Sequence, residues 1–248
     1  MDWDRGSYEE TGEELLPAAE HVVQQAGIEE GQEVLDLGTG SGNAAAIAAQ
    51  LGAKITAVDP SPRLLEVARN RVGEGDFQVA AAEDLPFEDQ SFDRILSLFA
   101  VIFSEAPQKA AQEITRTLKP DGRALITAWE PKGALNDALG ILGAATAKAA
   151  NTNSERFRWG DPDTVAALFE NADVQVEHAQ LRFSAPSAEA YISRFETSHP
   201  VGLVFKDVLT RVGTYAEVRE QARSALDADL PQAIGYLVYT ISSPRTAA

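Results

Sequence analysis

A glycine-rich stretch, Gly38-Thr39-Gly40-Ser41-Gly42, follows the short apolar run 34–37 and leads directly into an alanine-rich helical stretch at 43–51. Glycines at this spacing allow a tight turn and a close approach of backbone to ligand. The N–H groups at the start of the following helix can then bind polar ligand groups. The stretch predicts a nucleotide-type binding loop, although an ordinary tight turn between a strand and a helix has a similar composition.

Asp59 ends the next apolar run, 55–59, seventeen residues after Gly42. A carboxylate at this point can accept two hydrogen bonds from a ribose diol. It can also serve as the N-cap of a helix that begins near Pro62. A ribose-binding Asp59 suits a dinucleotide and an adenosyl ligand equally well.

The elements that must position these residues alternate along the chain. A first amphipathic helix covers 9–26, and 119–122 is a turn. Strands that alternate with helices at this spacing predict a doubly wound, largely parallel sheet with helices on both faces. The predicted strands are 34–37, 55–59, 77–81, 92–99 and 123–129, and the helices between them are 43–51, 62–72 and 108–118.

The pattern changes after residue 130. Helices at 133–150 and 163–169 precede two strands, 174–183 and 236–241, which complete a Rossmann-like, seven-stranded α/β sheet with an antiparallel last strand. Two helical patterns between these strands, 187–197 and 201–227, predict an inserted cap at about 187–230. We expect a single domain over 1–248, with an N-terminal lid and first helix (1–30), a cofactor-binding core (31–130) and the remaining strands with the cap (131–248).

Four strings within residues 30–130, VLDLGTGSG, VDPS, AEDLPFEDQSFDRILS and LKPDGRALITAW, appear together in a characteristic order. They resemble class I S-adenosylmethionine-dependent methyltransferases, most nearly the small-molecule, methyltransferase type 11-like members. A nicotinamide-binding fingerprint would prefer a third glycine where this chain has Asn43. The resemblance implies a methyltransferase that uses S-adenosyl-L-methionine and releases S-adenosyl-L-homocysteine.

The resemblance also implies roles for individual residues. The methionine portion of the cofactor would lie on the loop, and the ribose hydroxyls would bind Asp59. The adenine would lie beside Pro60 and Ser61, and its edge would meet Ala82 and Glu83. The loop residues are Asp36, Gly38, Thr39, Gly40 and Gly42, and the carbonyls of Leu98 and Phe99 would meet the methionine amine.

Aromatic residues outside the core strings are candidates for the rest of the site. Trp3 and Tyr8 resemble a W-x-x-x-x-Y opening that closes over cofactor in related enzymes, although they could simply pin the terminus to the core. Phe103, Trp129 and His199 are candidates for the acceptor pocket. His199 is also a weak candidate for a general base, whereas His21 and His178 are expected to be structural or exposed.

The composition of the chain limits the kinds of ligand and partner that we expect it to bind. The chain has no cysteine, three histidines and a formal charge of −17, and no Lys/Arg-rich run. We therefore expect no metal site, no nucleic-acid partner and no membrane span in a cytoplasmic enzyme that acts on a small molecule. A non-catalytic S-adenosylmethionine-binding module and, less favoured, an NAD(P)-dependent oxidoreductase are the alternatives.

Overall fold

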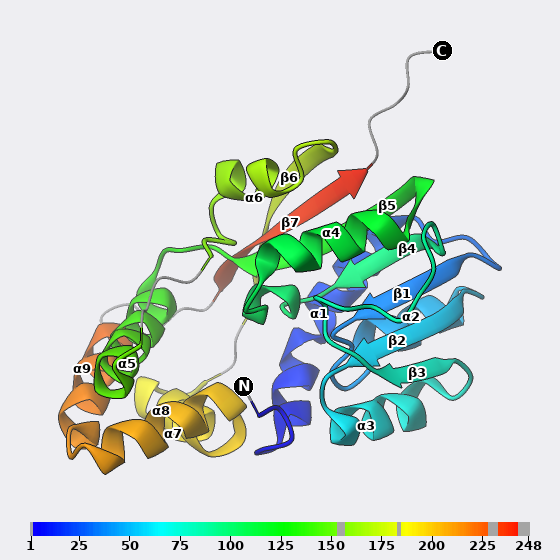
Figure 1. Cartoon of the computed structure of the whole chain (residues 1–248). Coiled ribbons are helices and arrows are strands. Elements are labelled where there is room, and N and C mark those ends of the chain that lie inside the picture. Colours follow the sequence, from blue (N-terminus) through cyan, green and yellow to red (C-terminus); the bar gives the residue numbers. More distant parts are fainter. Residues whose placement is uncertain (1, 153–156, 183–184, 228–232, 243–248) are drawn as a thin grey trace.

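The computed structural model describes residues 2–152, 157–182, 185–227 and 233–242. A seven-stranded sheet with the order β3-β2-β1-β4-β5-β7-β6 forms its centre (Figure 1). Strand β7 runs antiparallel to both of its neighbours, and the other pairings are parallel. The predicted doubly wound sheet with an antiparallel last strand is therefore confirmed. The strands are β1 (Glu33–Leu37), β2 (Lys54–Asp59), β3 (Asp76–Val79), β4 (Phe92–Ser97), β5 (Leu118–Trp129), β6 (Asp173–Leu181) and β7 (Ile234–Ser242).

Helices bury both faces of the sheet, as the largely apolar parallel strands require. Helices α1 (Tyr8–Ala26) and α2 (Asn43–Gln50) pack on one face, and α3 (Pro62–Val72) lies beside α2. Helices α4 (Pro107–Thr117) and α6 (Pro162–Leu168) pack on the opposite face. The single-turn helix η1 (Val101–Phe103) follows β4. Among the described residues, none of the helices has the length and apolar composition that a membrane span requires.

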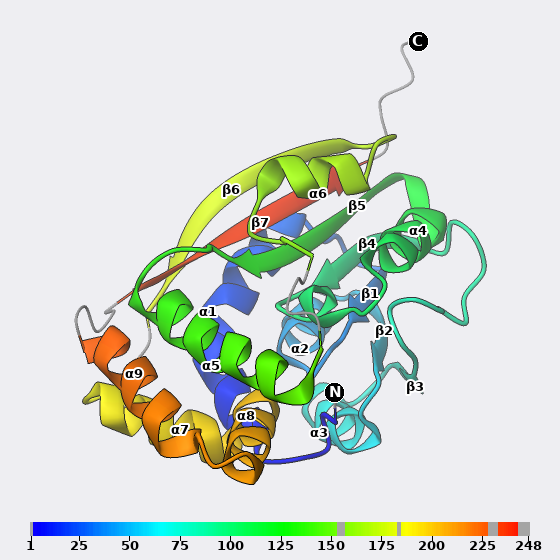
Figure 2. The same cartoon turned by 60° about the vertical axis from the view of Figure 1, so that its left-hand side comes forward.

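Four further helices share a separate apolar core that includes Leu142, Ile192, Phe205 and Leu226. They are α5 (Ala134–Ala150), α7 (Ala188–Ser198), α8 (Pro200–Arg211) and α9 (Tyr215–Asp227), and we call them the helical cap. Two views show them gathered at one end of the molecule, beyond the strands (Figures 1 and 2). Because α5 follows β5, this is the end where the parallel strands have their carboxyl termini.

Two local predictions are corrected by the structure. The segment 201–227 is two helices, because the chain breaks at Gly213, whose φ is +75°. The expected turn at 119–122 lies inside β5, where pairing with β4 jumps from Leu118 to Arg123. At 201–227 the helical periodicity continues across Gly213 and hides the break, whereas at 119–122 the turn-type residues form a register shift inside a strand that continues.

The junction of α7 and α8 generates a stability prediction. A Cβ on Gly202 would lie 2.1 Å from the backbone oxygen of Phe195, so Gly202→Ala forces the helices apart. We expect it to lower the free energy of unfolding by about 1–3 kcal/mol. In the interior of α5, a Cβ on Gly143 would meet only Phe205 Cζ at 3.8 Å. Gly143→Ala should raise stability by about 0.5–1 kcal/mol. Urea unfolding measures both, and equal effects would contradict this packing.

Candidate functional site

The loop between β1 and α2 adopts a conformation that glycine alone tolerates easily. Gly38 has a φ of +72°, and a Cβ there would lie 2.3 Å from the Cβ of Ala100. Gly42 has a φ of +84°, and its Cβ would lie 2.9 Å from the Cα of Ala68 in α3. Positive φ and close packing together explain why glycines occupy these positions.

Two buried carboxylates hold this loop. Asp36 accepts hydrogen bonds from the Thr39 hydroxyl at 2.7 Å and from the Ala45 N–H at 3.0 Å. Asp59 accepts from the N–H groups of Gly40 and Ser61, each at 2.9 Å. The two side chains therefore fix the loop from the ends of β1 and β2.

Burial raises the pKa of both carboxyl groups. It raises the pKa of Asp36 from 3.8 to about 6. For Asp59, burial raises the pKa while the hydrogen bonds from Ser61 and Gly40 oppose the shift. Asp59 does not cap the next helix: the N-cap of α3 is Ser61, whose hydroxyl accepts from the Leu64 N–H at 3.0 Å.

A cavity of about 490 Å³ opens beside the loop, and we call it the loop cavity. Most residues that the resemblance assigns to the cofactor line it. They are Tyr8, Gly38, Gly40, Asp59, Pro60, Ala82, Glu83 and Phe99, and Trp3 and Phe103 line it as well. Five others, Asp36, Thr39, Gly42, Ser61 and Leu98, are not among its lining residues in the described part of the chain. The contacts above show Asp36, Thr39, Gly42 and Ser61 building the loop and the start of α3.

Glu83 joins this cavity to the start of α4. Its Oε1 accepts from the Ser104 hydroxyl and from the Glu105 N–H at 3.1 Å. Burial opposes ionisation, but these hydrogen bonds outweigh it and hold the pKa of Glu83 below its usual value. The carboxylate therefore stays charged and fixes the 104–106 segment at the rim of the loop cavity.

The N-terminal segment crosses between the loop cavity and the helical cap. The Ser7 N–H donates to the backbone oxygen of Ser198 at 2.9 Å, and a Cβ on Gly6 would lie 2.2 Å from that same oxygen. Tyr8 lies against Gly40, where a Cβ would be 3.3 Å from its ring. Trp3 packs edge-on against Tyr8 and Phe103, at centroid distances of 5.5 and 4.9 Å. The segment thus contacts the loop and the cap at once.

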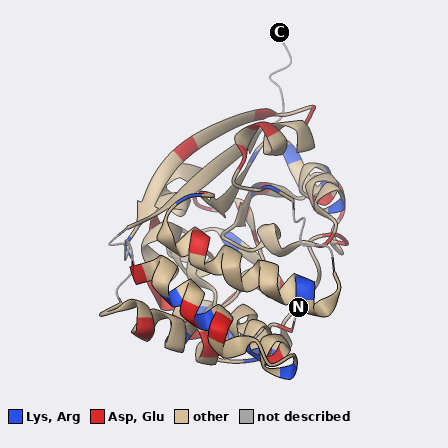
Figure 3. Ribbon diagram, turned by 90° about the vertical axis from the view of Figure 1, so that its left-hand side faces the viewer, with Lys and Arg blue, Asp and Glu red and all other residues tan. Residues whose placement is uncertain are grey.

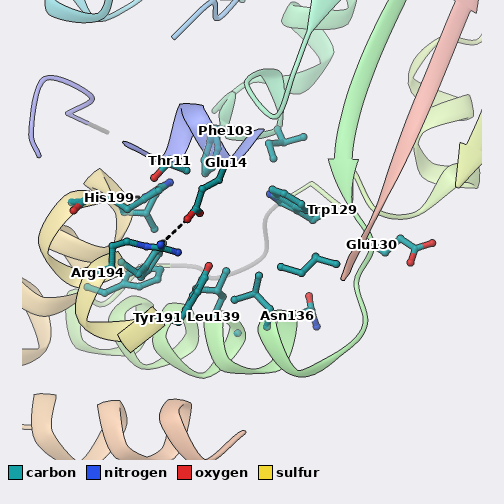
Figure 4. Close-up of a pocket in the computed structure, with 18 of the residues that line it drawn as sticks. Thr11, Glu14, Phe103, Trp129, Glu130, Asn136, Leu139, Tyr191, Arg194 and His199 are labelled. Atoms are coloured by element: carbon teal, nitrogen blue, oxygen red, sulfur yellow. Dashed lines mark hydrogen bonds and ion pairs between the residues drawn. The ribbon is translucent and has the colours of Figure 1, made fainter. Parts of the chain in front are cut away.

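A second cavity, of about 330 Å³, lies under the helical cap, and we call it the cap cavity (Figure 4). Its walls come from α1, η1, the end of β5, α5, α7 and α8. Trp129 and His199, two of the residues proposed from the sequence as candidates for an acceptor pocket, line this cavity and face it from opposite sides in Figure 4.

The two cavities share an aromatic partition. Phe103 lines both of them. Phe99 on the loop side stacks on Trp129 on the cap side, with centroids 4.0 Å apart and planes 15° apart. Phe99 has a φ of +51°, rare for a bulky residue, and its N–H donates to the Thr127 hydroxyl at 2.8 Å. Strained backbone of this kind often occurs at functional sites.

Sequence reasoning missed the polar groups of the cap cavity. Glu14 of α1 and Arg194 of α7 form an ion pair at 2.6 Å and point toward one another in Figure 4, with Tyr191 close by. Burial raises the pKa of Glu14, and Arg194 opposes that shift. These residues are 180 positions apart in the chain, so no local pattern could have paired them.

The third tryptophan and the other two histidines lie outside both cavities. Trp159 is buried in the core between α6 and the sheet and does not line the cap cavity. His21 bonds the Tyr236 hydroxyl at 2.9 Å, and His178 bonds Glu130 at 2.5 Å. Among the described residues, no three His, Cys, Asp or Glu side chains gather where they could hold a metal ion.

Comparisons with known proteins identify the family of the chain. Residues 35–126 match the family model of a methyltransferase domain. An uncharacterised protein of Mycobacterium tuberculosis is 32% identical over 194 residues, which cover 74% of this chain and 71% of that protein. A demethylmenaquinone methyltransferase of Clavibacter sepedonicus is 41% identical over 99 residues, 39% of this chain and 40% of that enzyme.

Solved structures share the fold. The YcgJ protein of Bacillus subtilis aligns with a TM-score of 0.61 at 22% identity, covering 91% of this chain and 98% of that one. A phosphoethanolamine N-methyltransferase of Haemonchus contortus, in complex with S-adenosylhomocysteine, aligns with a TM-score of 0.60 at 20% identity, covering 92% of this chain and 53% of that one. The chain belongs to the S-adenosylmethionine-dependent methyltransferase family.

The raised pKa of Asp36 generates a pH-dependent prediction. Between pH 3.8 and about 6 the folded protein holds this proton more tightly than the unfolded chain. Stability contributed by Asp36 therefore falls as pH rises through this window and is constant above it. Asp36→Asn keeps an oxygen that can accept from Thr39 and Ala45 but removes the titration.

Relative to the native protein, the Asp36→Asn variant should gain about 2 kcal/mol of unfolding free energy between pH 4 and pH 7. Urea unfolding at several pH values measures the difference, and the comparison cancels the contributions of the other carboxylates. A difference that stays flat across this range would show that Asp36 is not desolvated.

Proposed function

We propose that this chain transfers a methyl group from S-adenosylmethionine to a small molecule bound in the cap cavity. The observation that carries the proposal is the aromatic partition, in which Phe103 is a wall of both cavities and the Phe99–Trp129 stack joins them. A donor on one side and an acceptor on the other would meet at this wall. Holding two reactants at such a boundary is the main task of a methyltransferase site.

The loop cavity fits the adenosyl cofactor in shape and chemistry. Gly38 and Gly40 leave the backbone bare at the cavity wall. Each Asp59 oxygen already accepts one N–H, and each retains a second lone pair for a ribose hydroxyl. Pro60, Ala82 and Glu83 would border the adenine, as the family resemblance implies. S-adenosylmethionine, when bound, supplies a methyl group activated by a positively charged sulfur.

The chain's own residues would position the reactants and exclude water. Trp3, Tyr8 and Phe103 form an apolar cover at the point where the N-terminal segment meets the partition. Aromatic faces attract a cation, so these rings would favour a sulfonium over a neutral ligand. Water excluded from this point cannot compete with the acceptor.

The charge distribution supports a small acceptor in preference to a nucleic acid. On the helical cap, basic residues lie among acidic ones (Figure 3). Arg219 pairs with Glu189 and Glu196 at 2.6 and 3.0 Å. A nucleic-acid site would instead need cations available to phosphates, against an overall charge of −17.

Calorimetry with S-adenosylhomocysteine tests the proposal. We expect a dissociation constant near 1 μM, about −8 kcal/mol. Asp59→Asn should weaken binding by about 10- to 150-fold, corresponding to about 1.5–3 kcal/mol for hydrogen bonds to a charged group.

The matched control is Asp121→Asn, an exposed carboxylate within β5 that should leave the affinity unchanged. Asp59→Asn should also lower the free energy of unfolding, because the backbone N–H of either Gly40 or Ser61 would then face the N–H of the new side-chain amide. Binding of NAD without S-adenosylhomocysteine would overturn the proposal.

A further inference from the structure

The two ring nitrogens of His199 have different surroundings. His199 is the N-cap of α8, and its Nδ1 accepts the Val201 N–H at 3.1 Å. A nitrogen that accepts a hydrogen bond carries no proton, so the proton of the neutral ring lies on Nε2. In the described part of the chain, Nε2 has no hydrogen-bond partner, and the residue lines the cap cavity.

Burial, in part under aromatic side chains, keeps this ring neutral. Phe195 stacks on it at 4.9 Å, and Tyr8 and Trp3 pack edge-on at 5.4 and 6.2 Å. Burial lowers the pKa of His199 to about 4. With Nδ1 occupied and Nε2 protonated, the ring offers a hydrogen-bond donor and has no lone pair available to act as a general base.

The remaining walls of the cap cavity combine apolar side chains, a few neutral polar groups such as Thr11 and Asn136, and charged groups that are mostly paired. Ile102, Phe103, Leu135, Leu139 and Phe205 supply hydrocarbon surface. Glu14 is paired with Arg194 at 2.6 Å, and Glu130 with Lys132 at 2.9 Å. Glu10 accepts from the Ser198 hydroxyl at 3.0 Å and is exposed, so water screens its carboxylate. A charged acceptor would therefore lose hydration without gaining a buried counter-ion that is not already paired.

We propose that the cap cavity takes an uncharged, mainly apolar acceptor whose oxygen atom accepts a hydrogen bond from the Nε2–H of His199. This inference rests on the proposed function and adds a substrate class to it. His199 would set specificity and orientation by donating to the acceptor, which replaces the expectation that it removes a proton.

Four naphthalene probes of similar size test the charge and the oxygen separately. They are 2-acetonaphthone, its deoxygenated analogue 2-ethylnaphthalene, the anion 2-naphthoate and the cation 2-naphthylmethylammonium. Equilibrium dialysis with saturating S-adenosylhomocysteine measures each affinity. We expect the ketone to bind about 3- to 10-fold tighter than 2-ethylnaphthalene, as one neutral hydrogen bond allows, and at least about 10-fold tighter than either ion.

Two variants of His199 separate its role as hydrogen-bond donor to the acceptor from its role as the N-cap of α8. His199→Asn keeps a side-chain oxygen that can cap the N-terminus of α8, but its N–H donor does not reach as far into the cavity. His199→Phe keeps an aromatic ring but has neither an N-cap acceptor nor an N–H donor. Both should abolish the preference for the ketone over 2-ethylnaphthalene. Only His199→Phe should lower the free energy of unfolding appreciably, so a loss of preference shared by both variants cannot come from misfolding.

The failures of the two proposals are distinguishable. If the native protein binds S-adenosylhomocysteine but binds an ion as tightly as the ketone, or binds no probe, the inference about the acceptor is wrong. The same holds if both variants retain the preference for the ketone. If the native protein does not bind S-adenosylhomocysteine by calorimetry, the proposed function itself fails.

Discussion

The site depends on two buried carboxylates at the ends of neighbouring parallel strands. Asp36 and Asp59 each accept two hydrogen bonds, and three of these four bonds come from backbone N–H groups in or near the glycine loop and α3. Burying two acids is unfavourable unless their oxygens are satisfied, so the loop must adopt the one path that satisfies them. That path needs the left-handed conformation at Gly38 and Gly42, and it leaves the loop cavity open beside Asp59.

The rest of the site is built by side chains that pack one on another, starting at this loop. Tyr8 lies on Gly40, Trp3 lies on Tyr8 and Phe103, and the Ser7 N–H bonds to the end of α7. The N-terminal segment therefore couples the loop cavity to the helical cap. A change in the position of this segment would alter the walls of both cavities together, because Phe103 belongs to both.

The sequence predicts the glycine loop and Asp59 well, but it predicts the polar contacts around them and in the cap cavity poorly. Gly38, Gly40 and Asp59 are recognisable because local spacing between a strand and a helix determines where they lie, and the structure brings all three to one cavity. The pairing of Glu14 with Arg194 joins distant helices and leaves no local pattern. Ser61 rather than Asp59 caps α3, since both residue types favour that position and only the backbone decides between them. The role of His199 depends on which ring nitrogen meets Val201, which the sequence cannot specify.

The most direct measurement of the central claim is a crystal structure of the protein soaked with S-adenosylhomocysteine. We expect ligand density in the loop cavity, with the ribose hydroxyls on Asp59 and the sulfur at the aromatic partition beside Phe103. We also expect the hydrogen bonds of Asp36 and Asp59 to the loop to be unchanged by the ligand. Density in the cap cavity alone, or a ribose that does not contact Asp59, would contradict the account.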